Sequence, residues 1–333
     1  MNQLSDLTFD SLDTGVSAEE IDAYITKIGS KRYFTKQRSI FAYTVLSAIF
    51  IVMILSLWAV GMTTVIVYSV GFIVVLLILM GVMYAEKRTY EQYVRMRRFA
   101  QSNGFTITEK GVFDDNMKPG MIFDNGHSRK THGGYVLNDG TLIENYQYII
   151  GSGKHRQTHN YAYIEIPLAR NLPHMVLDAK GNNFLKIFSG LPDEFNTSQT
   201  LSLEGNFDQF FTLYAPREYE ADALYVFTPD VMAVLIDECK DYDIEIVDDK
   251  LYLYRNTHFK LDSSDEMKSI LRVVDVLRHE LHTQTGRYAD DNVRLSRHTN
   301  VVAGKGRRLK KGYRTTVVMA ILAALYVLFE VLL

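Results

Sequence analysis

The chain has 333 residues, enough for one folded domain together with membrane segments, and its net charge of −3 hides a strong segregation of charge. Its single cysteine, Cys239, excludes an intramolecular disulfide and a cysteine-rich zinc site. Basic residues cluster beside the apolar segments, whereas residues 204–249 hold thirteen acidic residues and only two basic ones.

Residues 1–38 form a first segment that predicts a short amphipathic helix ending near Gly29. Ser17 and Glu20 have the spacing of a capping box, and apolar residues recur at helical spacing after them. The polar face of this helix is acidic, so we expect it to pack against protein rather than lie on a bilayer.

Residues 39–85 predict a transmembrane helical hairpin. This run contains no Asp, Glu, Lys, Arg or His, and it is more than twice as long as the about 20 residues that one span requires. Residues 61–64 interrupt the aliphatic runs near the middle, so we expect the turn there. The length of the run and the acidic residues before it argue against a secretory signal peptide. Because the spans hold no ionisable residue, we interpret them as anchors rather than a transport path.

Charge at the ends of the spans predicts the topology. Both outer ends of the hairpin are basic, which places them and the residues after Ala85 in the cytoplasm of a multi-pass cell-membrane protein. Residues 315–333, with Glu330 as their only charge, predict a C-terminal transmembrane helix. We assign the basic residues near the spans to lipid headgroups rather than to nucleic acid. The residues expected to contact headgroups are Arg32, Lys87, Arg88, Arg307, Arg308, Lys310, Lys311 and Arg314.

Residues 86–286 predict an α+β cytoplasmic domain. A helix is expected to leave the membrane and end at Asn103, and turn signals such as Asp139-Gly140 then separate runs of β-branched and aromatic residues. The strands expected in an antiparallel sheet are residues 143–150, 158–166, 175–177, 184–188, 210–214, 224–227, 244–247 and 251–254. Helices are expected over residues 230–239, after the Thr228 cap, and over residues 264–285. Residues 287–314 are polar and basic and predict a tether to the last span.

Two local patterns resemble ligand motifs but fail on spacing. Residues 151–154, Gly-Ser-Gly-Lys, lack the first glycine and the final hydroxyl residue of a phosphate loop, so they predict a basic hairpin tip. His279 and His282 are three residues apart, whereas a zinc-peptidase helix needs four. We therefore expect no metal and no cofactor.

Three stretches resemble an uncharacterised family of bacterial integral membrane proteins. They are residues 203–214, with their LEGNFD and FTLY segments, residues 219–232, with DALY and TPDVM, and residues 243–254. The resemblance implies a bacterial source and a membrane location. That family has no known function, so the resemblance implies no catalytic residues.

The acidic region predicts a site for a protein partner, because it also holds tyrosines, which are common binding anchors. The expected partner-binding residues are Glu218, Glu220, Asp222, Tyr214 and Tyr219, and Tyr252 and Tyr254 are expected in the same surface cluster. The leading hypothesis is a non-enzymatic, membrane-anchored module that binds a membrane-proximal protein. One alternative is a membrane-bound hydrolase that uses carboxylates such as Glu204 and Asp208, or the two histidines. A lipid or small-ligand carrier is a third hypothesis, and it requires an apolar cavity.

Overall fold

The computed structural model describes residues 4–27, 36–55, 62–113, 118–181, 195–293 and 299–312. The chain divides into two compact units, of which one is Phe9–Phe99 and the other, the domain, combines Met1–Thr8 with Ala100–Leu333. Several predictions lie outside the described residues, namely the strand at 184–188, the span at 315–333, and the headgroup residues Arg32 and Arg314.

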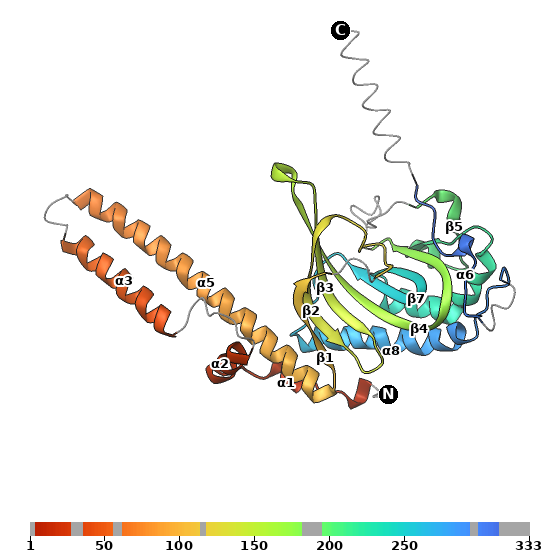
Figure 1. Ribbon diagram of the computed structural model, residues 1–333, viewed down its shortest axis with the longest axis horizontal. Helices are drawn as coiled ribbons and strands as arrows, with labels where there is room; N and C mark the ends of the chain where they lie inside the picture. Colours follow the sequence, from red (N-terminus) through yellow and green to blue (C-terminus); the bar gives the residue numbers. More distant parts are fainter. Residues whose placement is uncertain are drawn as a thin grey trace, which may run out of the picture. The chain divides into compact units, whose positions relative to one another are not determined.

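The unit Phe9–Phe99 is helical (Figure 1). Its helices are α1 (Asp10–Asp13), α2 (Ala18–Lys27), α3 (Lys36–Leu55) and α5 (Met62–Asn103), of which α5 continues into the domain. Within the described residues, one helix is long and apolar enough to cross a membrane: its span is Ile66–Asn103, and none of its most apolar stretch is buried. The apolar part of α3 that can be assessed, Tyr43–Val52, is shorter than a membrane span. One candidate span is therefore established, and the two-span hairpin stays a prediction.

The capping box predicted at the start of α2 is confirmed. The Ser17 backbone N–H donates to Glu20 Oε2 at 2.9 Å, and the Glu20 N–H donates to Ser17 Oγ at 3.2 Å. Glu20 also accepts a hydrogen bond from Arg98 on α5, and this bond is the main reason that the pKa of Glu20 falls to about 2. The rings of Tyr24 and Tyr93 stack at 6.3 Å. The helix thus packs against protein, as its acidic polar face predicts.

The domain is built on an antiparallel sheet that confirms the predicted α+β class. The strands are β1 (Thr106–Val112), β2 (His127–Val136), β3 (Leu142–Ile150), β4 (Gln157–Ala179), β5 (Thr200–Leu201), β6 (Phe211–Tyr214) and β7 (Asp243–Arg255). They follow the order β1-β2-β3-β4-β6-β5, and β7 pairs with β4. The predicted hairpin is present, since β3 and β4 pair from Leu142↔Glu165 to Ile150↔Gln157.

Two predictions of separate strands are wrong, because β4 and β7 are each continuous. Both run side by side from Ala162↔Arg255 to Leu177↔Ile244, so backbone pairing carries each strand through its weak point. In β4 the weak point contains Pro167, where the register shifts. In β7 the weak point is Asp248, in the gap predicted between residues 247 and 251. Asp248 has a φ of 54°, but it lies inside the continuous strand. The long pair curves strongly (Figure 1).

Helices cover one side of this sheet. The main ones are α6 (Glu220–Val226), α7 (Pro229–Glu238) and α8 (Ser264–Gly286). Elsewhere, the described chain also forms short 3-10 helices, which are η1 (Leu4–Asp6), η3 (Gly153–His155), η4 (Thr197–Gln199), η5 (Phe207–Gln209) and η6 (Gly304–Gly306). The Thr228 cap is confirmed, because its side chain accepts the Val231 N–H. The strand expected at 224–227 is wrong: Ala223 and Val226 are buried three residues apart, which suits one helical face.

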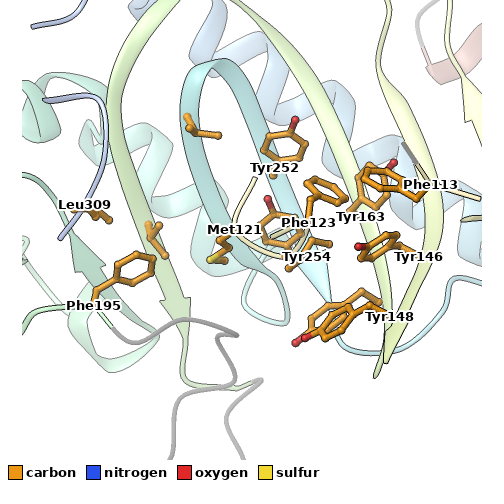
Figure 2. Packing of buried hydrophobic residues seen from close by; sticks show 14 residues of the cluster. Phe113, Met121, Phe123, Tyr146, Tyr148, Tyr163, Phe195, Tyr252, Tyr254 and Leu309 are labelled. Carbon is orange, nitrogen blue, oxygen red and sulfur yellow. The ribbon is translucent and has the colours of Figure 1, made fainter. Parts of the chain in front are cut away.

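Tyrosines fill the opposite face of the sheet. Alternation along β4 directs Tyr161 and Tyr163 to this face and Ile164 and Ile166 to the other. The aromatic layer consists of Tyr146 and Tyr148 from β3, Tyr161 and Tyr163 from β4, and Tyr252 and Tyr254 from β7. Phe123 inserts among them, with its ring centroid 5.0 Å from that of Tyr163 (Figure 2). The expectation that Tyr252 and Tyr254 lie on the surface is therefore wrong.

Candidate functional site

The predicted partner-binding residues fall mainly at the start of α6. Glu218 and Glu220 are exposed, and Asp222 is half-buried. Tyr219 is fully buried, so its expected place on a surface cluster is wrong. Tyr214 lies apart on β6, where its ring packs 5.5 Å from that of Phe195. The structure thus groups four of the five residues, and only by their closeness in sequence.

Residues of the predicted tether form hydrogen bonds and an ion pair with much of this group. The Tyr219 hydroxyl donates to Asp290 Oδ2 at 2.8 Å, and the Tyr288 hydroxyl donates to Asp222 Oδ1 at 2.7 Å. Lys305 forms an ion pair with Glu218. The described residues 287–293 and 299–312, which we call the strap, therefore lie against the domain.

Asp290 is the centre of the first half of the strap. Burial alone would raise its pKa, but hydrogen bonds from the Ala303 and Asn292 N–H groups and the Tyr219 hydroxyl hold the pKa below its ordinary value. The Ala303 N–H donates to Oδ2 at 2.8 Å, and that of Asn292 donates to Oδ1 at 2.8 Å. One carboxylate thus holds two parts of the strap and α6 together.

The second half of the strap crosses the curved sheet. Arg308 makes a bidentate pair with Asp248, at 3.0 and 2.9 Å. The Leu309 N–H donates to His174 Nδ1 at 2.9 Å, and the Leu309 side chain joins the core cluster (Figure 2). Of the predicted headgroup residues, Arg308 is thus paired with a carboxylate although its side chain is 51% exposed, and Lys310 and Arg307 are exposed as well. Headgroup contact by these residues stays a prediction.

Gly306 offers a way to detach the strap. A Cβ atom at Gly306 would lie 2.5 Å from Tyr219 Cζ, and Asp290 holds that ring in place. We expect Gly306→Val to cost about 1–3 kcal/mol through overpacking and to free the strap. Trypsin cleavage after Lys305 should then become faster. Gly304→Val is the matched control, because a Cβ there meets nothing within 4 Å. Equal cleavage rates in the two variants would contradict a docked strap.

The outer side of α6 exposes apolar side chains. Leu224 is 51% exposed and Tyr225 is 39% exposed, beside the exposed Glu220 and Ala221. We call these four residues the α6 face. Outside α3 and α5, the large apolar residues exposed in the described chain are Ile150, Leu224, Tyr225 and Val301. Two of the four are therefore adjacent on one short helix, in the most acidic part of the sequence.

Sequence reasoning missed Leu224 and Tyr225, because their Leu-Tyr-Val-Phe run is typical of a buried strand. The signal that was available is the spacing of Ala223 and Val226, which suits a helix whose remaining positions face solvent.

The residues of the hydrolase hypothesis lie in separate settings. Asp208 accepts hydrogen bonds from Ser202 Oγ and the Leu203 N–H and so closes its own loop, and Glu204 is exposed. His279 is exposed on α8. The side chain of His282 lies outside the description. Among the described residues, no group of three or more His, Cys, Asp or Glu residues is placed to hold a metal ion.

A small apolar cavity lies between α8 and the bulged part of β4. Its volume is about 30 Å³, and its lining includes Ile166, Leu251, Leu277 and Leu281. That volume suits one water molecule. It does not hold a lipid chain, so this cavity gives no support to the carrier hypothesis.

Comparisons with known proteins add little. No family model matches the chain, and no curated protein sequence matches it. A crystal structure of the mycobacterial trehalose monomycolate transport factor A, TtfA, is similar with a TM-score of 0.35 and 10% identity, over 56% of this chain and 92% of that one. A likeness at that level carries no argument about this protein's fold or function.

Proposed function

We propose that the protein is a membrane-anchored module whose α+β domain binds a membrane-proximal protein through the α6 face. The observation that carries the proposal is the exposure of Leu224 and Tyr225 side by side, at 51% and 39%. Exposed apolar side chains that stand together mark interaction surfaces, and tyrosine is among the residues enriched at the centres of protein interfaces. The acidic residues around them favour a partner with a basic rim.

The membrane part of this proposal has three spans. The candidate span in α5 and the apolar side chains exposed along α3 support the helical hairpin over residues 39–85. The uncharged run at 315–333, apart from Glu330, supports the third span. Basic residues at the span ends favour a cytoplasmic location for the domain. The proposed spans keep the domain near the bilayer, so we expect its partners to be membrane-proximal.

Site-specific photo-crosslinking in cells tests the partner-binding role. With the photoreactive residue at Ala221, we expect one discrete adduct, whereas the same residue at Asn138 should give none. A central anchor side chain contributes about 2 kcal/mol, so Leu224→Ser should weaken the complex about 30-fold. Leu224→Met keeps the apolar volume and serves as the matched control. An adduct whose yield is the same in both variants would rule out the α6 face.

The contribution of charge to partner binding is tested at Glu220 rather than at the neighbouring acidic residues. Glu218 and Asp222 contact the strap, so reversing their charge would disturb the domain itself. Glu220 is exposed and sits on the same face as Leu224. Glu220→Lys is therefore the variant that reports the rim charge, and its effect should weaken as the salt concentration rises.

A further inference from the structure

The hairpin between β3 and β4 projects beyond the rest of the sheet. Pairing of β2 with β3 stops at His127↔Ile149, and pairing of β4 with β7 starts at Ala162↔Arg255. Beyond those pairs only β3 and β4 pair with each other, up to Ile150↔Gln157. At about 3.3 Å per residue, the five residues from Gln157 to Tyr161 carry β4 roughly 16 Å past the end of β7. Figure 1 shows this projecting ribbon.

The turn at the end of this hairpin is held by a hydrogen bond from the start of β2. His127 Nε2 donates to the Gly151 carbonyl oxygen at 2.9 Å. Gly151 and Gly153 have φ of 74° and 56°, which glycine adopts without strain. The turn is therefore built to present the residues that follow it.

The hairpin tip, which we define as residues 150–158, is basic and exposed at every position. It carries Lys154, His155 and Arg156, and the sequence contains no Asp or Glu from residue 145 to residue 164. Neither Lys154 nor Arg156 forms an ion pair with any residue in the described part of the chain. Two uncompensated charges thus stand at the end of a projection.

One apolar side chain accompanies these charges. Ile150 is 43% exposed at the tip, although apolar side chains elsewhere in the domain are mostly buried. A basic surface with an exposed aliphatic side chain suits a lipid interface, where headgroups meet the charges and the boundary of the acyl chains receives the apolar group. The tip holds no Phe, Tyr or Trp on which a nucleic acid base would stack.

The position of the strap also supports contact between the hairpin tip and a membrane. In Figure 1 the tip and the last described strap residues, in dark blue, point toward the same side of the domain. Those strap residues lead toward residues 315–333, which we propose as the third span.

From these features we propose that the hairpin tip docks on anionic lipid headgroups of the membrane that anchors the chain. The inference rests on the membrane anchoring in the proposed function, but not on the α6 face. Lys154 and Arg156 supply the attraction, and Ile150 enters the headgroup boundary. The tip would act as an additional contact that holds the domain against the bilayer.

Fluorescence quenching in nanodiscs tests the docking with the full chain. A fluorophore is placed on Ser152→Cys, since the native Cys239 is fully buried, and headgroup-labelled nitroxide lipids act as the quencher. We expect strong quenching in discs of phosphatidylcholine mixed with phosphatidylglycerol and weak quenching in phosphatidylcholine alone. Removing two charges by Lys154→Gln with Arg156→Gln should lower the docked-to-free ratio about 30-fold.

Control experiments distinguish docking on lipid headgroups from other causes of quenching. Lys240→Gln with Lys260→Gln removes two exposed charges elsewhere and should leave quenching unchanged. Equal quenching in both kinds of disc, or no effect of the tip variant, would overturn the docking. Release by inorganic phosphate at constant ionic strength would overturn it too, because it would indicate a small-anion site. Failure of the chain to enter discs at all would instead refute the membrane anchoring.

Discussion

Raising the pH from about 10 to about 11 is expected to lower the free energy of unfolding of the domain by about 4 kcal/mol through its layer of buried tyrosines alone. The cause is the aromatic layer, in which burial is the largest of the causes that raise the pKa values of Tyr161, Tyr163, Tyr252 and Tyr254 above their ordinary value of 10.0. In the unfolded chain these phenols ionise near pH 10, while in the folded domain they stay protonated. Stability from them is therefore complete below about pH 10 and is lost as the pH rises, at about 1 kcal/mol per tyrosine over that first unit.

Alkaline unfolding of the detergent-solubilised chain measures this effect. The phenolate absorbance that comes from the aromatic layer should rise in one steep step, together with the change in the near-ultraviolet circular dichroism of the domain. Tyr161→Phe removes one of the four groups, so it should reduce the contribution of the aromatic layer to the pH dependence by about a quarter. Gradual ionisation of every tyrosine while the dichroism stays constant would show that water reaches the aromatic layer.

Local signals predicted much of the domain. The Thr228 cap of α7, the apolar stripe of α8 and the alternation in the β3–β4 hairpin depend on residues close in sequence, so they are visible without the structure. The continuity of β4 and β7 is not visible in this way. Pro167 and Asp248 each resemble a break, and only the pairing of the two strands along their whole length overrides these local preferences.

The candidate site was likewise predicted only in part, because some of its features depend on residues far apart in the sequence. Acidic residues at the start of α6 were found by composition, but the partners they already have lie some 70 to 90 residues away, as Tyr219–Asp290 and Glu218–Lys305 show. Composition predicted a polar tether to the last span, but it did not predict that the described part of this segment docks on the domain as a strap. Its buried residues are Tyr288, Asp290, Val302, Gly306 and Leu309, and their spacing resembles no regular element. Long-range docking of an irregular segment leaves no periodic signal in a single sequence.

Glu245→Leu is expected to lower the free energy of unfolding by about 3–5 kcal/mol, because it leaves three buried hydrogen-bond donors without their acceptor. Glu245 on β7 is 1% exposed. Its Oε2 accepts hydrogen bonds from the Met121 N–H at 2.7 Å and from the Tyr254 hydroxyl at 2.6 Å, and its Oε1 lies 2.8 Å from His174 Nε2. The carboxylate thus joins β4, β7 and the segment that carries Phe123.

The strap sets the direction of one of these bonds. Because the Leu309 N–H can only donate, His174 Nδ1 must accept, and the proton must sit on Nε2, facing Glu245. In Glu245→Gln the carbonyl oxygen can still serve Met121 and Tyr254, but the amide N–H₂ then opposes the His174 N–H. We expect an intermediate loss of about 1–3 kcal/mol and earlier trypsin cleavage of the strap. Denaturant titration of the solubilised chain, followed by aromatic dichroism, ranks the variants. If the glutamine variant is as stable as the wild type, the orientation of His174 contributes nothing, and the link from strap to sheet depends on the packing of Leu309 alone.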